Sequence, residues 1–449
     1  MAKQEKQSLY QSKETVYPRL IKSKSNRQRK RYAGLLYAIF FLLPWLEWGN
    51  KPVIYFHLTE RQFHIFCWTF WPQDFMYLAW LLIIAAFALF FFTTIAGRLW
   101  CGFLCPQTIW TMVFVWIEEK IEGHALARQA LAKEPLTGKR LIKKISKHSL
   151  WFMVALITGI NFVAYFYPIR TLLTDMLSLS MPIEGVVWIS IFTYLTYLDA
   201  GWLREQVCIY MCPYARFQGV MYDKDTLIVT YNDDVGEPRG SIKSGAKGGC
   251  IDCSLCVQVC PTGIDIRQGQ QIDCINCGLC VDACDQVMQS VARPSNLITW
   301  SALDKNTGQK LKWLRPKMIA YATVLVIMVG VFSVSLLNRS EIELSVIKDR
   351  DYMYRRLNDG QVANYYVIKV GNKSQQKQHY TLILSPETAS FSKRFNPNIT
   401  LEAGELKELD VSVMQAKEKA GVKPLSIAVQ SVSTGKVLAT VNTRFMFPR

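Results

Sequence analysis

The chain has 449 residues, 50% of them apolar, and its 52 Lys and Arg outnumber 35 Asp and Glu to give a formal charge of +17. That length accommodates two or three domains. The positive charge could suggest nucleic acid, but the sequence has no aromatic-studded basic groove and no base-reading motif. Much of the excess lies beside long apolar stretches, where membrane topology is the simpler cause. Composition therefore argues against a nucleic-acid partner and against a purely soluble protein.

Residues 1–31 form a basic amino-terminal segment. They hold ten Lys and Arg against two Glu, so we expect a solvated cytoplasmic tail. About thirty polar residues precede the first apolar run, a pattern that does not fit a cleavable signal peptide.

Five apolar stretches are long enough to predict membrane helices in a multi-pass protein whose partner is membrane lipid. They are Tyr32–Gly49, Met76–Gly97, Leu150–Ile169, Val186–Gly201 and Met318–Leu337. Four of them fall in a 32–237 membrane domain, and the fifth occupies residues 318–337. Basic residues concentrate in 118–149 and just before the fifth stretch, so we expect the amino terminus, the 98–149 loop and residues 238–317 on the cytoplasmic side. An odd number of spans then places residues 340–449 outside.

A C-x3-C-P motif occurs twice, each time after a predicted helix that runs from outside to inside. The copies are Cys101, Cys105 and Pro106, then Cys208, Cys212 and Pro213. On a helix, positions i and i+4 share a face, so each pair of sulfurs could converge, and the proline favours a helix boundary. Soft thiolates select Cu(I), zinc or iron–sulfur centres. We interpret the four cysteines as a copper or thiol-redox site, the alternative being that they are small buried residues.

Residues 238–317 contain eight of the thirteen cysteines in two runs, C-x2-C-x2-C-x3-C, with Pro261 after the first run and Asp285 after the second. This is the spacing of a two-cluster bacterial ferredoxin, in which the fourth cysteine of each run ligates the other 4Fe–4S cluster. The expected ligand sets are Cys250, Cys253, Cys256 and Cys284 for one cluster, and Cys274, Cys277, Cys280 and Cys260 for the other. Zinc ribbons use paired C-x2-C units, and disulfides need an oxidising compartment, so we favour neither.

The first outer loop carries His57, His64 and Cys67 near several tryptophans. Three potential ligands could form a metal site. Their irregular spacing favours an interfacial structural loop, and their role stays open.

Residues 340–449 change to alternating apolar and polar runs, which predict strands at Val362–Val370, His379–Leu384, Glu408–Met414 and Leu425–Val429. About 110 residues of short strands predict an immunoglobulin-like β-sandwich. The segment has no cysteine and no catalytic grouping, so we interpret it as a docking module.

The sequence resembles the cytochrome c oxidase accessory protein family, called CcoG, FixG or RdxA, over nearly its whole length. The matching stretches are Trp71–Phe75, Trp100–Thr108, Cys208–Gln218, Asp223–Val229, Cys250–Ile266 and Ala283–Met288. Asp285 in place of proline is usual in this family.

The resemblance implies a protein of the bacterial inner membrane that helps assemble the cbb3-type haem–copper oxidase. Its expected activity is reduction of Cu(II) to Cu(I), with two 4Fe–4S clusters as the electron reservoir and the four motif cysteines holding copper. Oxidase subunits or copper-delivery proteins are the expected partners. The sequence leaves the electron donor unidentified, and a homodimer is one candidate assembly.

Two other functions fit the same features. A quinol-oxidising subunit of the NapH or NosR type also combines membrane helices, C-x3-C-P pairs and paired clusters, although the outer β-domain fits the accessory family better. A non-enzymatic assembly scaffold would use its clusters only for stability or sensing.

Overall fold

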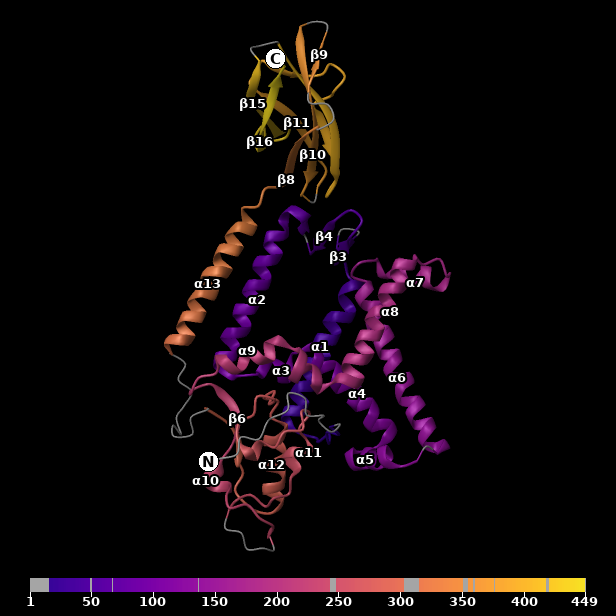
Figure 1. Cartoon of the computed structure of the whole chain (residues 1–449), viewed down its shortest axis with the longest axis vertical. Helices are drawn as coiled ribbons and strands as arrows, with labels where there is room; N and C mark the ends of the chain where they lie inside the picture. Colours follow the sequence, from indigo (N-terminus) through magenta and orange to yellow (C-terminus); the bar gives the residue numbers. More distant parts are fainter. Residues whose placement is uncertain are drawn as a thin grey trace, which may run out of the picture. The chain divides into compact units, whose positions relative to one another are not determined.

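The computed structural model describes residues 16–48, 51–66, 68–135, 137–242, 248–302, 315–349, 354–357, 360–374, 376–416 and 420–448. The chain divides into two compact units (Figure 1). One comprises Met1–Trp45 with Leu81–Val329, and the other Leu46–Trp80 with Gly330–Arg449. Cys67 and the first fifteen residues of the predicted basic tail lie outside the described residues.

The first unit is mostly helical. Its helices are α1 (Lys24–Leu42), α3 (Leu99–Phe103), α4 (Pro106–Glu122), α5 (Ala125–Lys133), α6 (Gly138–Val163), α7 (Ile169–Leu177), α8 (Ile183–Tyr197) and α9 (Pro213–Met221). Two π-helical segments, η3 (Leu198–Leu203) and η4 (Val207–Met211), precede α9. The helices α2 (Phe75–Ala96) and α13 (Pro316–Leu337) each contribute residues to both units.

Four helices in the described part of the chain are long and apolar enough to cross a membrane: Phe75–Ala96, Leu99–Glu122, Ile183–Leu203 and Pro316–Leu337. Three of them match predicted spans. Leu99–Glu122 does not, because the sequence analysis placed it in a cytoplasmic loop. The other two predicted spans fall on α1 and α6, which are helical but begin in runs of Lys and Arg that lower their apolar character.

Close packing joins α4, α6 and the segment after α8. Trp151 of α6 is buried against Phe114 of α4 and donates a hydrogen bond from Nε1 to its carbonyl oxygen at 3.0 Å. Gly159 permits the approach of α6 to α8, since a Cβ there would lie 2.7 Å from Thr193 Oγ1. These contacts build a rigid helical frame behind the two cysteine motifs.

The described part of the predicted solvated basic tail, residues 16–31, is packed along part of its length, although six of its seven Lys and Arg are exposed. The Ser23 side chain caps α1 by accepting a hydrogen bond from the Asn26 N–H, and Arg29 is only 6% exposed. This segment also bonds to the cysteine-rich region, with the Ser25 N–H donating to Asp282 Oδ2 at 2.7 Å and Gln286 Nε2 donating to the Lys22 carbonyl at 2.9 Å. We call this segment, residues 16–31, the strap.

The cysteine-rich region is framed by β6 (Leu227–Tyr231) and β7 (Ile298–Ala302), which pair antiparallel. Between them lie α10 (Asp233–Gly236), α11 (Leu255–Gln258), the short η6 (Ile266–Gln268) and α12 (Leu279–Ser290). The strand pair brings the two ends of the region together, and α11 and α12 carry Cys256, Cys280 and Cys284.

The second unit contains the predicted β-sandwich. One antiparallel sheet has the order β12-β14-β10-β8 with β9 beside β10, and the other has the order β13-β11-β15-β16. The strands are β8 (Ile342–Lys348), β9 (Arg355–Arg356), β10 (Gln361–Asn372), β11 (Gln378–Ser385), β12 (Ala389–Phe391), β13 (Asn398–Leu401), β14 (Leu406–Ala416), β15 (Gly421–Ser431) and β16 (Val437–Phe447). All four predicted strands are confirmed, and alternate residues such as Ile368, Val413 and Ile427 form the core.

The amino-terminal segment of this unit holds β1 (Glu47–Trp48), β2 (Lys51–Pro52), β3 (Ile54–His57), β4 (Gln62–Ile65) and β5 (Trp68–Phe70), followed by the 3-10 turn η2 (Pro72–Asp74). Asp74 is buried and pairs with Arg339 just after α13 and with Lys373, whose Nζ lies 3.3 Å from Asp74 Oδ1. One carboxylate therefore ties this segment to the sandwich.

Candidate functional site

The two cysteine runs have matching backbone geometry. Asp252 and Ser254 of the first run adopt positive φ angles of 53° and 55°, and the equivalent Asn276 and Gly278 of the second adopt 50° and 71°. Left-handed residues curl the chain tightly, and Ser254 and Gly278 form the amino-terminal caps of α11 and α12. Each run thus turns around a central space before entering its helix.

The eight cysteines lie close to one another in two neighbouring groups. Cys284 lies close enough to Cys256, Cys250 and Cys253 to interact with them electrostatically. Cys260, Cys274, Cys277 and Cys280 instead line one small cavity. Cys256, from the first group, borders the same cavity, so the two groups lie next to each other.

The chemistry of these cysteines fits iron–sulfur clusters. All twelve cysteines in the described residues are free thiols. Burial raises the pKa of Cys274 and Cys284 to about 12 and that of Cys256 to about 11. Such thiols become thiolates only when a metal replaces the proton. Within the described residues no three His, Cys, Asp or Glu side chains converge on one point.

The two C-x3-C-P motifs also share one local structure. Cys101 lies within α3 and Cys208 within η4, whereas Cys105 and Cys212 are extended caps of α4 and α9. Pro106 and Pro213 begin those helices, where their missing N–H costs nothing. The predicted helix boundary is therefore confirmed, but the expectation that each pair shares one helix face is wrong, because the helix breaks between the two cysteines.

The fold nevertheless brings the four motif cysteines together. Cys101 lies close enough to Cys105, Cys208 and Cys212 for electrostatic interaction between the thiols. The same holds for the other three pairs among these four cysteines. A buried side chain joins the two copies, because Cys101 Sγ donates to Gln218 Oε1 of α9 at 3.4 Å. Gln218 in turn donates to Thr93 Oγ1 of α2 at 3.4 Å. We call these four cysteines the thiol quartet.

The thiol quartet lies directly against the second cysteine run. A Cβ on Gly102 would lie 2.8 Å from the Ile275 carbonyl oxygen and 3.0 Å from Cys277 Cα. Cys101 packs in one hydrophobic cluster with Cys277 and, at its edge, Cys280. The strap completes the contact, since Arg29 Nε donates to the Gly102 carbonyl at 2.9 Å. We call this contact the junction.

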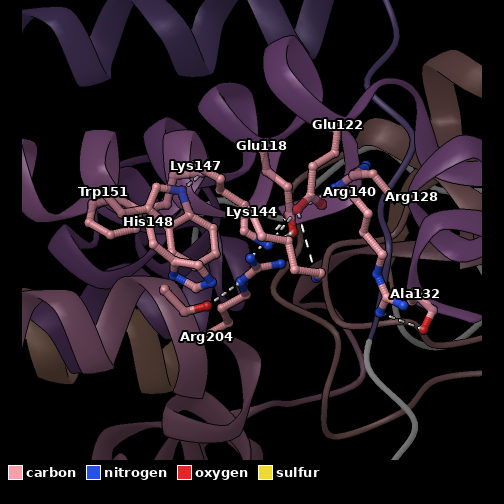
Figure 2. Close-up of polar contacts among 12 residues, drawn as sticks. Glu118, Glu122, Arg128, Ala132, Arg140, Lys144, Lys147, His148, Trp151 and Arg204 are labelled. Atoms are coloured by element: carbon pink, nitrogen blue, oxygen red, sulfur yellow. Dashed lines mark hydrogen bonds and ion pairs between the residues drawn. The ribbon is translucent and has the colours of Figure 1, made fainter. Parts of the chain in front are cut away.

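A buried ion network that the sequence analysis missed supports the quartet. Figure 2 shows two carboxylates, Glu118 and Glu122 of α4, surrounded by cations. Glu118 pairs with Arg128 at 3.1 Å, Lys147 at 3.4 Å and Arg204 at 3.0 Å, and Glu122 pairs with Lys147 at 2.9 Å.

Arg204 links this network to the second motif. Its φ angle of 43° is a strained conformation for a residue with a side chain. The ion pair with Glu118 and a 3.0 Å hydrogen bond from Gln107 Nε2 to the Arg204 carbonyl hold it there. Because Gln107 and Glu118 belong to the helix that follows the first motif, the network fixes the two motifs relative to each other. Residues 118, 128, 147 and 204 have no common spacing, so no sequence pattern reveals them.

The outer-loop histidines have local partners. His64 is buried and its Nδ1 lies 2.9 Å from Thr69 Oγ1, while His57 Nδ1 lies 3.2 Å from Glu60 Oε2. Neither belongs to a metal-binding group in the described residues.

Family models match three parts of the chain. Residues 203–303 match a 4Fe–4S dicluster domain, residues 78–122 match a 4Fe–4S binding domain, and residues 332–448 match the immunoglobulin-like fold at the C-terminus of FixG. With its apolar helices, the chain is therefore an iron–sulfur electron-transport protein associated with a membrane.

Curated relatives match most of the chain. Proteins RdxA and RdxB of Cereibacter sphaeroides are each 37% identical to it, over 90% and 85% of this chain and 87% and 84% of their own. The nitrogen fixation protein FixG of Rhizobium meliloti is 33% identical over 84% of this chain and 80% of its own. The chain belongs to the FixG/RdxA family.

Proposed function

We propose that the protein reduces Cu(II) to Cu(I) at the thiol quartet during assembly of cbb3-type cytochrome c oxidases. The single observation that carries this proposal is the junction, where Cys101 packs with Cys277 and Cys280. When bound, the two 4Fe–4S clusters supply one-electron storage. We assign Cys250, Cys253, Cys256 and Cys284 to one cluster and Cys274, Cys277, Cys280 and Cys260 to the other.

The proposed reaction is a single electron transfer. Each Cu(II) ion would gain one electron and become Cu(I), the cluster cysteines would hold the group that supplies this electron, and no proton would need to move. Cys101, Cys105, Cys208 and Cys212 are the proposed copper ligands, no more than two at a time in this conformation, because no three ligating side chains of the described residues converge on one point. Thiolate ligands favour Cu(I) over Cu(II), so ligation and reduction act in the same direction.

The proposed location is the bacterial inner membrane, with the cysteine-rich region cytoplasmic and the β-sandwich periplasmic. The distribution of Lys and Arg along the chain supports this sidedness. Membrane-impermeant labelling of single cysteines introduced at exposed positions of each unit tests it. Labelling of the sandwich from the cytoplasmic side would contradict it.

The test uses full-length protein purified without oxygen. Iron, sulfide and copper are quantified, and Cu(II) is titrated into the dithionite-reduced protein while cluster absorbance is followed. We expect about eight iron atoms per chain, as two 4Fe–4S clusters require, and one cluster oxidation for each Cu(I) formed. The double variant Cys101→Ser/Cys105→Ser should lose copper binding and keep its iron, with Cys67→Ser as the matched control. Unchanged copper stoichiometry in the double variant would overturn the proposal.

The match of residues 78–122 to a 4Fe–4S binding domain favours a second possibility, since it includes Cys101 and Cys105. In that case the quartet holds iron rather than copper. The same experiment separates the two, because the double variant would then lose iron and the parent would contain more than two clusters account for.

A further inference from the structure

Two buried arginines flank the junction. Arg29 of α1 is 6% exposed and Arg98, the residue before α3, is 3% exposed. Arg29 donates to the Gly102 carbonyl, and Arg98 Nη2 donates to the Ala215 carbonyl of α9. Arg98 therefore connects the first motif to the second, while Arg29 connects the strap to the first motif.

These two arginines differ from the other buried arginines in their partners. Arg128 and Arg204 pair with Glu118, and Arg315 pairs with Asp223. By contrast, no Asp or Glu among the residues that the structure describes forms an ion pair with Arg29 or Arg98. Both guanidinium groups are charged at any accessible pH.

A buried charge without a counter-charge is strongly unfavourable, so negative charge should be close to each arginine in the working protein. The groups that can supply it are the cysteines. Arg29 acts electrostatically on Cys277, and Arg98 acts on Cys274 of the second cysteine run and on Cys101 and Cys208 of the thiol quartet. These cysteines become negatively charged when they bind metal as thiolates.

Backbone packing keeps Arg98 at this place. Gly97 has a φ angle of 53°, and a Cβ there would lie 2.5 Å from Asn276 Nδ2. The residue before Arg98 thus contacts the loop between Cys274 and Cys277 directly. Arg98 is held between the loop and the quartet rather than on a flexible surface.

We propose that Arg29 and Arg98 are the counter-cations of the junction, where they raise the reduction potential of the cluster bound by Cys274, Cys277, Cys280 and Cys260. This inference rests on the proposed cluster assignment. A fixed positive charge stabilises the more negative, reduced form of a nearby centre. Net charge, hydrogen bonds and solvent exposure are the factors that set cluster potentials. The two arginines are positioning residues, since they act on the cysteines and touch no substrate.

The test is a redox titration of the full-length protein, purified without oxygen and followed by electron paramagnetic resonance. The variants are Arg29→Gln, Arg98→Gln and Arg98→Lys. Arg315→Gln is the matched control, because it removes a buried arginine that has a carboxylate partner. The signal of the junction cluster is identified as the one that Cys277→Ser removes.

We expect each glutamine variant to shift the one-electron equilibrium of the junction cluster at least tenfold toward the oxidised form, a fall of about 59 mV. Arg98→Lys should keep most of the parent's reduction potential. In Arg315→Gln the reduction potential of the junction cluster should equal that of the parent, and the potential of the other cluster should be the same in all variants. Unchanged potentials in both glutamine variants would overturn the inference. If the glutamine variants lose their iron, the Arg98→Lys variant provides the test. Loss of iron or a lower reduction potential in Arg98→Lys would exclude a role for charge alone. Absence of cluster signals from the parent protein would instead overturn the proposed function.

Discussion

Gly102, between the two cysteines of the first motif, lies against Cys277 of the second cysteine run. A methyl group on Gly102 would lie only 3.0 Å from Cys277 Cα and 2.8 Å from the Ile275 carbonyl oxygen. Both neighbours are backbone atoms that cannot rotate away. The motif and the cluster-binding loop can touch only because this residue has no side chain.

Replacement of Gly102 by alanine should therefore separate the two centres. We expect Gly102→Ala to slow Cu(II)-dependent oxidation of the reduced clusters by at least about tenfold, because electron transfer and alignment both suffer from ångström-scale misplacement. Stopped-flow absorbance measures the rate. Gly34→Ala in α1 is the control, since no atom lies within 4 Å of a Cβ there. Equal oxidation rates in the parent and Gly102→Ala would show that electrons do not pass through the junction.

Glu118 compensates three buried cations, so its neutralisation should destabilise the helical unit. We expect Glu118→Gln to cost roughly 3–5 kcal/mol of unfolding free energy, the usual effect of removing one partner from a buried ion pair. Thermal unfolding in detergent measures the change. Glu119→Gln, one residue along α4, has no ion pair in the described chain and should behave like the parent. A Tm for Glu118→Gln equal to that of Glu119→Gln would contradict the expectation.

His148 gives the helical unit a pH dependence. Burial lowers the pKa of His148 below its ordinary value of 6.5, with further lowering by the charges of Lys147 and Lys144. Between the two pKa values the unfolded chain binds more protons than the folded protein, so the free energy of unfolding falls as the pH drops below about 6.5. We expect the Tm to be level above about pH 7 and to fall toward pH 5. His148→Gln should flatten this profile, and a variant profile that still falls would assign the dependence to another group.

Asp74 should control the stability of the sandwich unit. It is buried against Arg339 and Lys373, so Asp74→Asn leaves two cations without their shared carboxylate. We expect faster proteolysis of the sandwich and a loss of roughly 3–5 kcal/mol. The exposed Asp410 provides the control variant Asp410→Asn. Equal proteolysis rates in the two variants would mean that the ion pairs contribute little.

Loss of single cluster ligands distinguishes electron transfer from scaffolding. We expect Cys253→Ser and Cys277→Ser to lower iron content by up to about half, as loss of one of two clusters requires, and to stop oxidase maturation in cells. Iron analysis, immunoblotting of the protein and oxidase activity are measured together. Normal maturation with normal protein levels in both variants would favour the scaffold.

The sequence predicted those strands and helix starts that depend on residues close together in the chain. Strand alternation located β10, β11, β14 and β15, and the prolines after Cys105 and Cys212 marked the starts of α4 and α9. These features depend on neighbours in the sequence. The left-handed conformations of Asp252, Ser254 and Asn276 were not predicted, because left-handed turns favour glycine and these residues have side chains.

Features that depend on distant residues could not be read in this way. The Glu118 network draws on residues from several helices, and the contact of Gly102 with Cys277 joins segments that share no periodicity. The strap shows the same difficulty, because the burial of Arg29 and the hydrogen bonds of Ser25 and Lys22 depend on residues far along the chain. The number of candidate membrane spans also differs from the prediction. The search for apolar stretches did not take into account that α1 and α6 begin with charged residues.

The strap has a consequence for biosynthesis. Ser25 bonds to Asp282, which is 257 residues later in the chain. At bacterial translation rates of about 5–20 residues per second, the strap waits at least about 13 seconds for its docking surface to emerge from the ribosome. Metal loading of the second cysteine run and docking of the strap on α12 can therefore both begin only once residues 274–284 have left the ribosome. An amino-terminal tag that delays closure should lengthen the time in which iron can enter.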